Sequence, residues 1–132
     1  IILFISFLIL FTDQFTNLVK DFTERLRPCR SDEIQDLLRN IDIRCGKYGF
    51  FSAHAANSIS VTIFITNCLD KSVKKFITPT LILWVLVFSY SRIYLGVHYP
   101  LDTFFGLIFG LFSGLLFKNI YNYFISQKVF SD

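Results

Sequence analysis

The chain has 132 residues, a length that predicts one domain spanning residues 1–132. Apolar residues make up 53% of it, its mean hydropathy is +0.52, and charged residues account for 17%, against about 25% in soluble domains. This composition excludes a disordered chain and a disulfide-rich secreted scaffold, and it indicates a membrane protein. A net charge of +3 is too mild for a nucleic-acid-binding protein, so we expect the membrane, and no nucleic acid, among the partners.

Four apolar stretches follow one another along the chain, at residues 1–19, 50–69, 76–95 and 101–120. Each is close to the roughly 20 residues that a helix needs to cross about 30 Å of hydrocarbon. The segment 81–88 lacks the polar stripe that a helix buried in a soluble bundle shows. We therefore predict about four spanning helices. Because the chain begins inside the first stretch and contains no methionine, we also expect further residues upstream.

The connection between the first two stretches, residues 20–47, is long and carries charges of both signs. Ile34, Leu37, Leu38 and Ile41 recur within it at helical spacing, which predicts a short amphipathic helix lying on the membrane surface. The predicted fold class is therefore all-α: a multi-span transmembrane helical bundle with one short interfacial helix.

The last apolar stretch carries a stripe of small residues, in which Gly106, Gly110 and Gly114 are each four positions apart. In lipid, small residues at this spacing allow two helix backbones to approach closely, so the stripe predicts a helix-packing face. Asp102 lies one further step of four back along the same stripe. We therefore expect it to face protein and not lipid.

Alternate crossing of the membrane gathers the polar residues that flank the four stretches at one membrane surface. They are Lys20, Arg27, Ser52, His54, Arg92, His98 and Asp102. The lysine and the two arginines would repel one another unless a multiply charged anion lay between them. Phosphate fits, because arginine binds its oxygens bidentately and lysine acts as a point charge.

The two histidines and the carboxylate of this set indicate nucleophilic and acid–base chemistry. Asp102 follows His98 by four residues, so it can fix the tautomer of the ring and leave the other nitrogen as a nucleophile. His54, on a different helix, is then available as a general acid. Each element also has a less specific interpretation: Lys20 and Arg25 as snorkelling anchors, and the histidines as satisfied polar groups near the interface. A metal site is disfavoured, because the chain has two histidines and no cysteine or glutamate cluster at ligand spacing.

Three motifs occur in order between residues 20 and 102. The first, Lys-x6-Arg-Pro, reads Lys20, Arg27 and Pro28, and the third, Ser-Arg-x5-His-x3-Asp, reads Ser91, Arg92, His98 and Asp102. Between them, Phe51-Ser52-Ala53-His54 stands where Pro-Ser-Gly-His is expected. Together these motifs resemble those of the type 2 phosphatidic acid phosphatase superfamily of membrane lipid phosphatases, whose fold is shared with vanadium haloperoxidases. Ala53 keeps the backbone N–H of the family's glycine, so we expect an active enzyme with a slightly altered pocket.

The resemblance implies a mechanism. His98 attacks phosphorus and forms a phosphohistidine, Asp102 orients it, and His54 protonates the leaving group and then activates water. The phosphate oxygens are stabilised by Lys20, Arg27 and Arg92, by the Ser52 hydroxyl and by the Ala53 N–H. No metal and no cofactor is expected. The family typically has six spanning helices with these motifs in the C-terminal part, which implies a chain truncated at its N-terminus.

The function implied is that of an integral-membrane lipid phosphatase. Its substrate would be a phosphorylated lipid such as undecaprenyl diphosphate, phosphatidic acid, phosphatidylglycerol phosphate or a lipid A phosphate. The alternative is a non-catalytic membrane protein that binds phosphorylated lipid headgroups. A haloperoxidase of the same fold is disfavoured, because those enzymes are soluble and the helices of this chain are apolar.

The basic turn at residues 70–75 predicts the orientation, because compact basic loops stay in the cytoplasm. We therefore expect a multi-pass protein of the cell (inner) membrane with an extracytoplasmic site at the opposite end of the bundle. Cys29 and Cys45 lie on the side of the site, where a disulfide between them and two free thiols are both consistent with the sequence.

Overall fold

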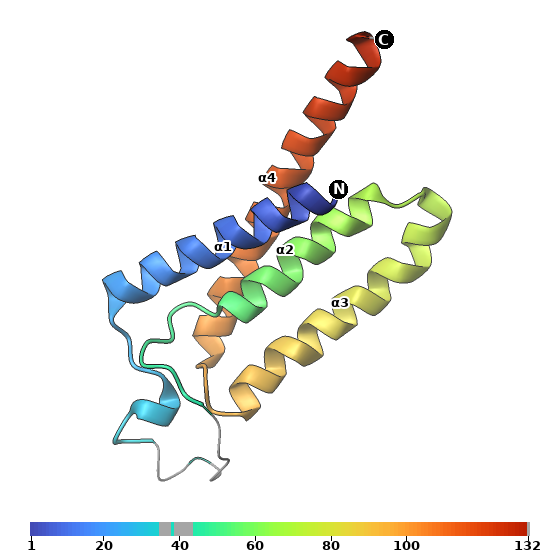
Figure 1. The fold of residues 1–132 in the computed structure, drawn as a ribbon. Helices are drawn as coiled ribbons and strands as arrows, with labels where there is room; N and C mark the ends of the chain where they lie inside the picture. Colours follow the sequence, from blue (N-terminus) through green and yellow to red (C-terminus); the bar gives the residue numbers. More distant parts are fainter. Residues whose placement is uncertain (35–37, 39–43, 132) are drawn as a thin grey trace.

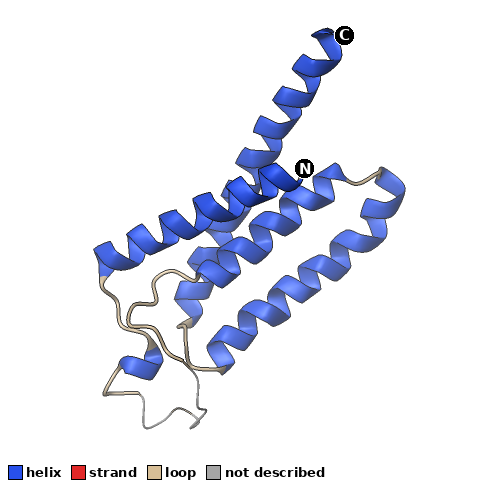
Figure 2. Ribbon diagram, in the orientation of Figure 1, coloured by secondary structure: helices blue, strands red, loops and turns tan. Residues whose placement is uncertain are grey.

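The fold is built from helices in the part of the chain that the computed structural model describes, which is residues 1–34, 38 and 44–131, with side chains up to residue 127. The helices are α1 (Ile2–Thr23), α2 (Ala53–Cys68), α3 (Lys71–Tyr94) and α4 (Pro100–Ser131), with a short 3-10 turn, η1 (Pro28–Arg30), after α1 (Figures 1 and 2). Within these residues the extended pairing is limited to an isolated bridge between Leu26 and Tyr48. The predicted all-α class is confirmed.

Three of the helices are long and apolar enough to cross a membrane: α1, α3, and α4 from Pro100 to Gln127. They correspond to the first, third and fourth predicted stretches. Large apolar side chains such as Phe7, Leu83 and Phe112 are exposed on their outer surfaces. Such extensive apolar exposure marks a surface that contacts lipid in a multi-pass membrane protein.

The second predicted stretch folds into α2, which is 16 residues long. A helix of this length rises about 24 Å, less than the hydrocarbon thickness. α2 contacts α1, α3 and α4 and lies between them (Figure 1). Its hydroxyl groups are buried by these neighbours and bond to carbonyl groups of the same helix, as Ser58 does to Ala55. Surrounding protein thus explains why a short helix rich in hydroxyl groups is stable here.

The glycine stripe of α4 is the surface that packs against α2. A Cβ atom added to Gly106 would lie 2.5 Å from the Ser52 carbonyl oxygen, and one added to Gly114 would lie 2.7 Å from the Ser60 carbonyl oxygen. At Gly110 the added atom would meet the Ala56 carbonyl oxygen at a still shorter distance. The two backbones are therefore in direct contact, and the predicted packing face is confirmed.

The described parts of the connection from α1 to α2 lie beside the helix ends that they join (Figure 1), and the bridge between Leu26 and Tyr48 brings them together. The structure joins Cys29 and Cys45 within it by a disulfide, with Cα atoms 6.5 Å apart. Cys68, at the far end of α2, is a free thiol. The amphipathic helix predicted around Ile34, Leu37, Leu38 and Ile41 falls largely outside the described residues, which omit 35–37 and 39–43.

Candidate active site

Four helix ends meet at one end of the bundle: the last turns of α1 and α3 and the first turns of α2 and α4 (Figure 1). Every residue that the sequence assigns to the site lies at this end or in the connection beside it. They are Lys20, Arg27, Ser52, Ala53, His54, Arg92, His98 and Asp102. The charges of Arg92, Lys20 and Arg27, together with His98, all act on the His54 imidazole. The structure therefore places these residues at one end of the bundle, as predicted, and their roles in binding and catalysis stay a prediction.

His98 and Asp102 form the buried centre of the site. His98 is 2% exposed and Asp102 is fully buried, and His98 Nδ1 lies 3.6 Å from Asp102 Oδ2. That separation is longer than a hydrogen bond, and Nδ1 has no other hydrogen-bond partner in the described part of the chain. Burial lowers the pKa of His98 below its ordinary value of 6.5; Asp102 opposes this effect, whereas the charges of Arg27 and Lys20 reinforce it. The imidazole is thus kept neutral near pH 7.

Asp102 has partners besides His98. Its Oδ2 accepts a hydrogen bond of 2.9 Å from the Tyr99 N–H, and its Oδ1 pairs with Arg25 Nη1 at 2.8 Å. The Asp102 backbone carbonyl also accepts a 2.9 Å hydrogen bond from the Ser52 N–H. The carboxylate is therefore held by α4, by the preceding link and by the connection after α1.

Arg25 is the residue of the site that the sequence analysis missed, because it considered this arginine only as a membrane anchor. Its guanidinium also lies 4.6 Å from the centre of the Tyr99 ring. No local pattern in the sequence identifies it. The chain beside Arg25 is fixed by the bridge between Leu26 and Tyr48, which comes from the returning part of the connection.

Arg27 is fixed by backbone groups of the returning connection. Its Nε donates to the Tyr48 carbonyl at 2.9 Å, and its N–H donates to the Lys47 carbonyl at 3.2 Å. Gly49 allows the connection to approach closely, since an added Cβ there would lie 3.0 Å from Arg27 Cγ and 3.3 Å from Asp102 Oδ2. One end of the Arg27 fork is thus held in place, and the terminal nitrogens remain for an anion.

Arg92 reaches the site from the last turn of α3. Its guanidinium lies 4.6 Å from the centre of the Phe88 ring, which itself stacks on Trp84 at 5.2 Å. Arg92 Nε is buried and has no hydrogen-bond partner among the described residues. A buried, unpaired donor of a charged group is costly unless a ligand satisfies it, so Arg92 is prepared for an anion.

The first turn of α2 faces the same space. Ser52 is the fully buried N-cap, and its Oγ accepts a 3.4 Å hydrogen bond from the Ala55 N–H. Ala53 and His54 follow as the first two helical residues, where backbone N–H groups and the helix dipole favour anions. Phe51, which replaces the family's proline, is buried with its ring 5.1 Å from that of Phe109. The departures in this motif therefore leave a well-packed helix start.

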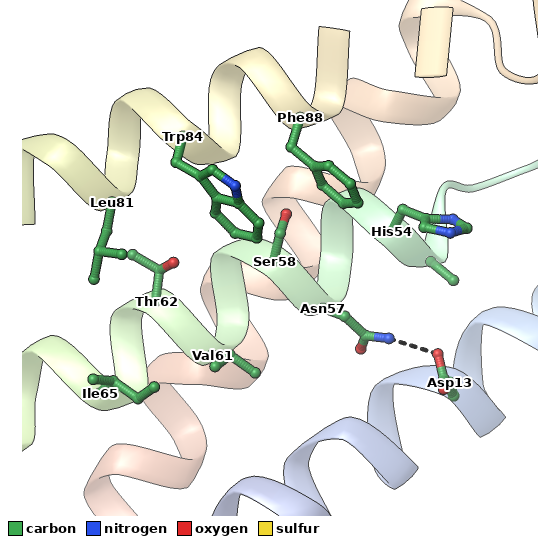
Figure 3. Close-up of a pocket in the computed structure, with 11 residues that line it drawn as sticks. Asp13, His54, Asn57, Ser58, Val61, Thr62, Ile65, Leu81, Trp84 and Phe88 are labelled. Carbon is green, nitrogen blue, oxygen red and sulfur yellow. Dashed lines mark hydrogen bonds between the residues drawn. The ribbon is translucent and has the colours of Figure 1, made fainter. Parts of the chain in front are cut away.

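A groove of about 570 Å³ leads away from His54 between α1, α2 and α3 (Figure 3). Its walls are mostly apolar and include Trp84, Phe88 and Ile65. Asp13 and Asn57 form the polar part of the wall, and the Asn57 amide donates a 2.6 Å hydrogen bond to Asp13 Oδ1 (Figure 3). The groove is lined by an imidazole at one end and by apolar side chains at the other, which suits an amphipathic ligand.

Comparison with known proteins identifies the family. A family model described as the PAP2 superfamily matches residues 1–126. The chain belongs to the PAP2 superfamily. Its fold matches the crystal structure of a transmembrane PAP2 type phosphatidylglycerolphosphate phosphatase from Bacillus subtilis with a TM-score of 0.77 and 24% identity, over 91% of this chain and 58% of that one. At this identity the match shows the PAP2 fold alone.

Two curated relatives of this PAP2 chain are lipid A 4'-phosphatases. The one from Bacteroides thetaiotaomicron is 40% identical over 95% of the chain and 53% of its own length. The one from Porphyromonas gingivalis is 35% identical over 87% of the chain and 48% of its own length. The chain thus spans about half the length of the curated relatives it matches.

Among the described residues, no group of three or more His, Cys, Asp and Glu side chains is arranged to hold a metal ion. The ionisable groups of the site are instead dominated by cations around two imidazoles. Such a set is suited to binding a tetrahedral oxyanion through its oxygens.

Proposed function

We propose that this chain carries the active site of an integral-membrane phosphatase that hydrolyses a phosphorylated lipid. The observation that supports this proposal is the convergence of three cations, two histidines and a buried carboxylate from four helix ends. Their residues are Lys20, Arg27, Arg92, His54, His98 and Asp102. Membership of the PAP2 superfamily supports the same reaction class.

In the proposed mechanism His98 is the nucleophile. Its unprotonated Nε2 attacks phosphorus, an N–P bond forms, and the P–O bond to the lipid breaks. His54, as imidazolium, gives its proton to the leaving oxygen. Neutral His54 then takes a proton from water, the resulting hydroxide attacks the phosphohistidine, and the N–P bond breaks to release phosphate. His98 ends neutral and His54 ends protonated, so the cycle closes.

Asp102 and the cations supply positioning and charge in this mechanism. In the proposed mechanism Asp102 accepts a hydrogen bond from the Nδ1–H of His98, which directs the lone pair of Nε2 toward phosphorus, and we expect the present 3.6 Å separation to shorten when the imidazole becomes positive. The equatorial oxygens are bound by Lys20, Arg27 and Arg92, by the Ser52 hydroxyl and by the Ala53 N–H. Phosphoryl transfer depends mainly on such positioning and charge stabilisation.

The groove beside His54 accommodates an acyl chain of the substrate while the phosphate occupies the cation cluster. Among the candidate lipids, the two lipid A 4'-phosphatase relatives favour a lipid A type phosphate over undecaprenyl diphosphate, phosphatidic acid and phosphatidylglycerol phosphate. We place the protein in the cell (inner) membrane with the site on the extracytoplasmic side, because the opposite end carries the basic residues Lys71, Lys74 and Lys75.

Release of inorganic phosphate from these four lipids by the protein in detergent tests the proposal. We expect turnover of at least one lipid, and a loss of at least a thousandfold in His98→Ala, because the nucleophile is removed. Tyr90→Phe, a change at an exposed side chain of α3, is the control and keeps wild-type turnover. Equal release by wild type and His98→Ala would contradict the proposal. Lipid binding without any release would instead support the headgroup-binding alternative.

A further inference from the structure

Asp13 is an acidic residue in the middle of a spanning helix that the proposed mechanism does not use. It lies in α1, which is long and apolar enough to cross a membrane, and its side chain is half-buried. Ionisable groups at this depth are costly and are retained chiefly where they have a function. Within the described residues, its carboxylate has one hydrogen bond, the 2.6 Å contact of Oδ1 with the Asn57 amide.

The charge of Asp13 is not needed to join α1 to α2. The Thr12 hydroxyl already donates to Asn57 Oδ1, so a neutral pair links the two helices at this point. Thr12 is fully buried behind this contact, whereas Asp13 lines the groove. The second carboxylate oxygen is therefore left for something that enters the groove.

The position of the pair relative to the site is defined by α2. Asn57 follows His54 by three residues on the same face of the helix, so the pair lies about 4.5 Å deeper in the bundle than His54. Figure 3 shows Asn57 projecting from α2 toward Asp13 of α1, with the hydrogen bond between them, and His54 nearer the start of α2. When the phosphate is beside His54, the lipid group that contacts Asp13 is one attached close to the phosphate, on the side of the membrane interior.

We propose that Asp13, held by Asn57, is a specificity-determining residue that selects lipids carrying a hydrogen-bond donor directly beneath the phosphate. This inference rests on the proposed phosphatase function. A carboxylate accepts hydrogen bonds and donates none, so it is matched by hydroxyl and amide N–H groups. These groups are abundant in a phosphorylated glycolipid with free sugar hydroxyls and amide-linked hydroxyacyl chains.

Two of the other candidate lipids lack the matching group. A diacylglycerol phosphate presents ester carbonyls at this depth, which only accept hydrogen bonds, and a polyprenyl diphosphate presents hydrocarbon. Entry of either lipid removes water from the second Asp13 oxygen without supplying a hydrogen-bond donor in its place, and a desolvated charged oxygen with no donor is unfavourable. Asp13 therefore favours the glycolipid and rejects the other two classes.

The test compares two substrates: a synthetic glucosamine disaccharide phosphate with amide-linked 3-hydroxyacyl chains, and dioleoyl phosphatidic acid. Asp13→Asn preserves volume and Asp13→Leu removes polarity. We expect kcat/KM for the glycolipid to fall by roughly tenfold to a hundredfold in both variants, the range for loss of a hydrogen bond to a charged group, with the larger loss in Asp13→Leu. For phosphatidic acid we expect an unchanged or increased value. Asp70→Asn, at an exposed carboxylate on the turn before α3, is the matched control and changes neither substrate.

Binding gives a second readout that does not depend on catalysis. Trp84 is the single tryptophan of the chain and lines the groove, so its fluorescence reports lipid entry in the inactive His98→Ala background. We expect tighter binding of the glycolipid than of phosphatidic acid, and loss of this preference when Asp13→Asn is added. This binding preference can be measured even if no lipid is hydrolysed and the proposed phosphatase function is therefore wrong.

Two results overturn the inference while leaving the phosphatase function intact. One is an equal fall of kcat/KM for both lipids in the Asp13 variants, which would indicate a role in helix packing or in the reaction itself. The other is an unchanged preference for the glycolipid in both turnover and binding. Thermal unfolding of each variant identifies any loss that is due to misfolding.

Discussion

At the scale of single residues, several effects of opposite sign act on the pKa of the His98 imidazole. Burial and the charges of Arg27 and Lys20 favour its neutral form, whereas Asp102 favours the protonated form. Burial has the larger effect, so the pKa of His98 lies below 6.5. Only the neutral ring can attack phosphorus, and this gives the pH dependence of the reaction a definite sign.

We predict that kcat/KM rises with pH along an acid limb whose midpoint is below 6.5, the ordinary value for histidine. Below the pKa of His98 in the free enzyme the imidazolium has no lone pair, and activity is lost tenfold per pH unit. Initial rates measured between pH 4 and 9 at low substrate concentration provide the profile. An acid limb centred above pH 7 would show that Asp102, and not burial, has the larger effect on the pKa of His98.

Arg25 gives a second prediction at this scale. In Arg25→Gln the Asp102 carboxylate loses its 2.8 Å ion pair, so its negative charge acts more fully on His98. We expect the acid limb of kcat/KM to move to higher pH, and Arg25→Lys to keep most of the wild-type profile. A fall in activity without a shift of the acid limb would instead indicate that Arg25 contacts the substrate.

The contrast between Arg25 and the other site residues shows what the sequence can and cannot predict. Lys20, Arg92 and His98 were predicted because they lie at or beside the ends of apolar stretches, and alternate crossing brings such ends together. Arg27 was predicted because it completes the Lys-x6-Arg-Pro motif that begins at Lys20. Arg25 lies in the connection, where the direction of a side chain depends on the pairing of Leu26 with Tyr48. That pairing joins segments about twenty residues apart, and neither segment has a periodic pattern that predicts it.

At the scale of helices, hydropathy predicted the position of the four long helices but did not indicate which of them is enclosed by the others. Residues 50–69 are as apolar as a spanning stretch, yet α2 is a 16-residue helix enclosed by its neighbours. Apolar composition is the same for a helix that faces lipid and for one that faces protein. The glycine stripe of α4 was the better guide, because it requires another backbone close by.

Gly110 offers the sharpest test of this packing. Alanine is the better helix former by about 1 kcal/mol, so Gly110→Ala would stabilise an isolated helix. In the bundle its methyl group would meet the Ala56 carbonyl oxygen and the Ile59 side chain. We therefore expect a net loss of about 1–3 kcal/mol in the free energy of unfolding.

Denaturation in detergent, followed by helical circular dichroism, measures this effect. Leu115→Phe, which enlarges an exposed side chain on the same helix, is the control and should change stability by less than about 0.5 kcal/mol. Stabilisation by Gly110→Ala would mean that α2 and α4 are not in backbone contact at this position.

At the scale of the whole molecule, two independent features bear on the orientation in the membrane. The basic residues Lys71, Lys74 and Lys75 were predicted in a turn but lie in the first turns of α3, directly after the two-residue link from α2. The site lies at the other end of these helices. The disulfide between Cys29 and Cys45 lies on the site's side of the bundle, and disulfides persist in oxidising compartments outside the cytoplasm. A cytoplasmic turn and an extracytoplasmic site satisfy both.

Thiol labelling in spheroplasts of a bacterial host tests this orientation and the disulfide together. Before reduction we expect no reaction of Cys29 or Cys45 with a membrane-impermeant maleimide. After treatment with an impermeant phosphine both thiols should react, because in this orientation the disulfide between cysteines 16 positions apart is on the side of the medium. Cys68 lies at the opposite end of α2 and should react only after lysis.

The variant Cys68→Ser removes that background, and Cys29→Ser should leave Cys45 reactive without reduction. Labelling of Cys68 in intact spheroplasts, with Cys29 and Cys45 protected until lysis, would reverse the orientation and place the phosphate site in the cytoplasm.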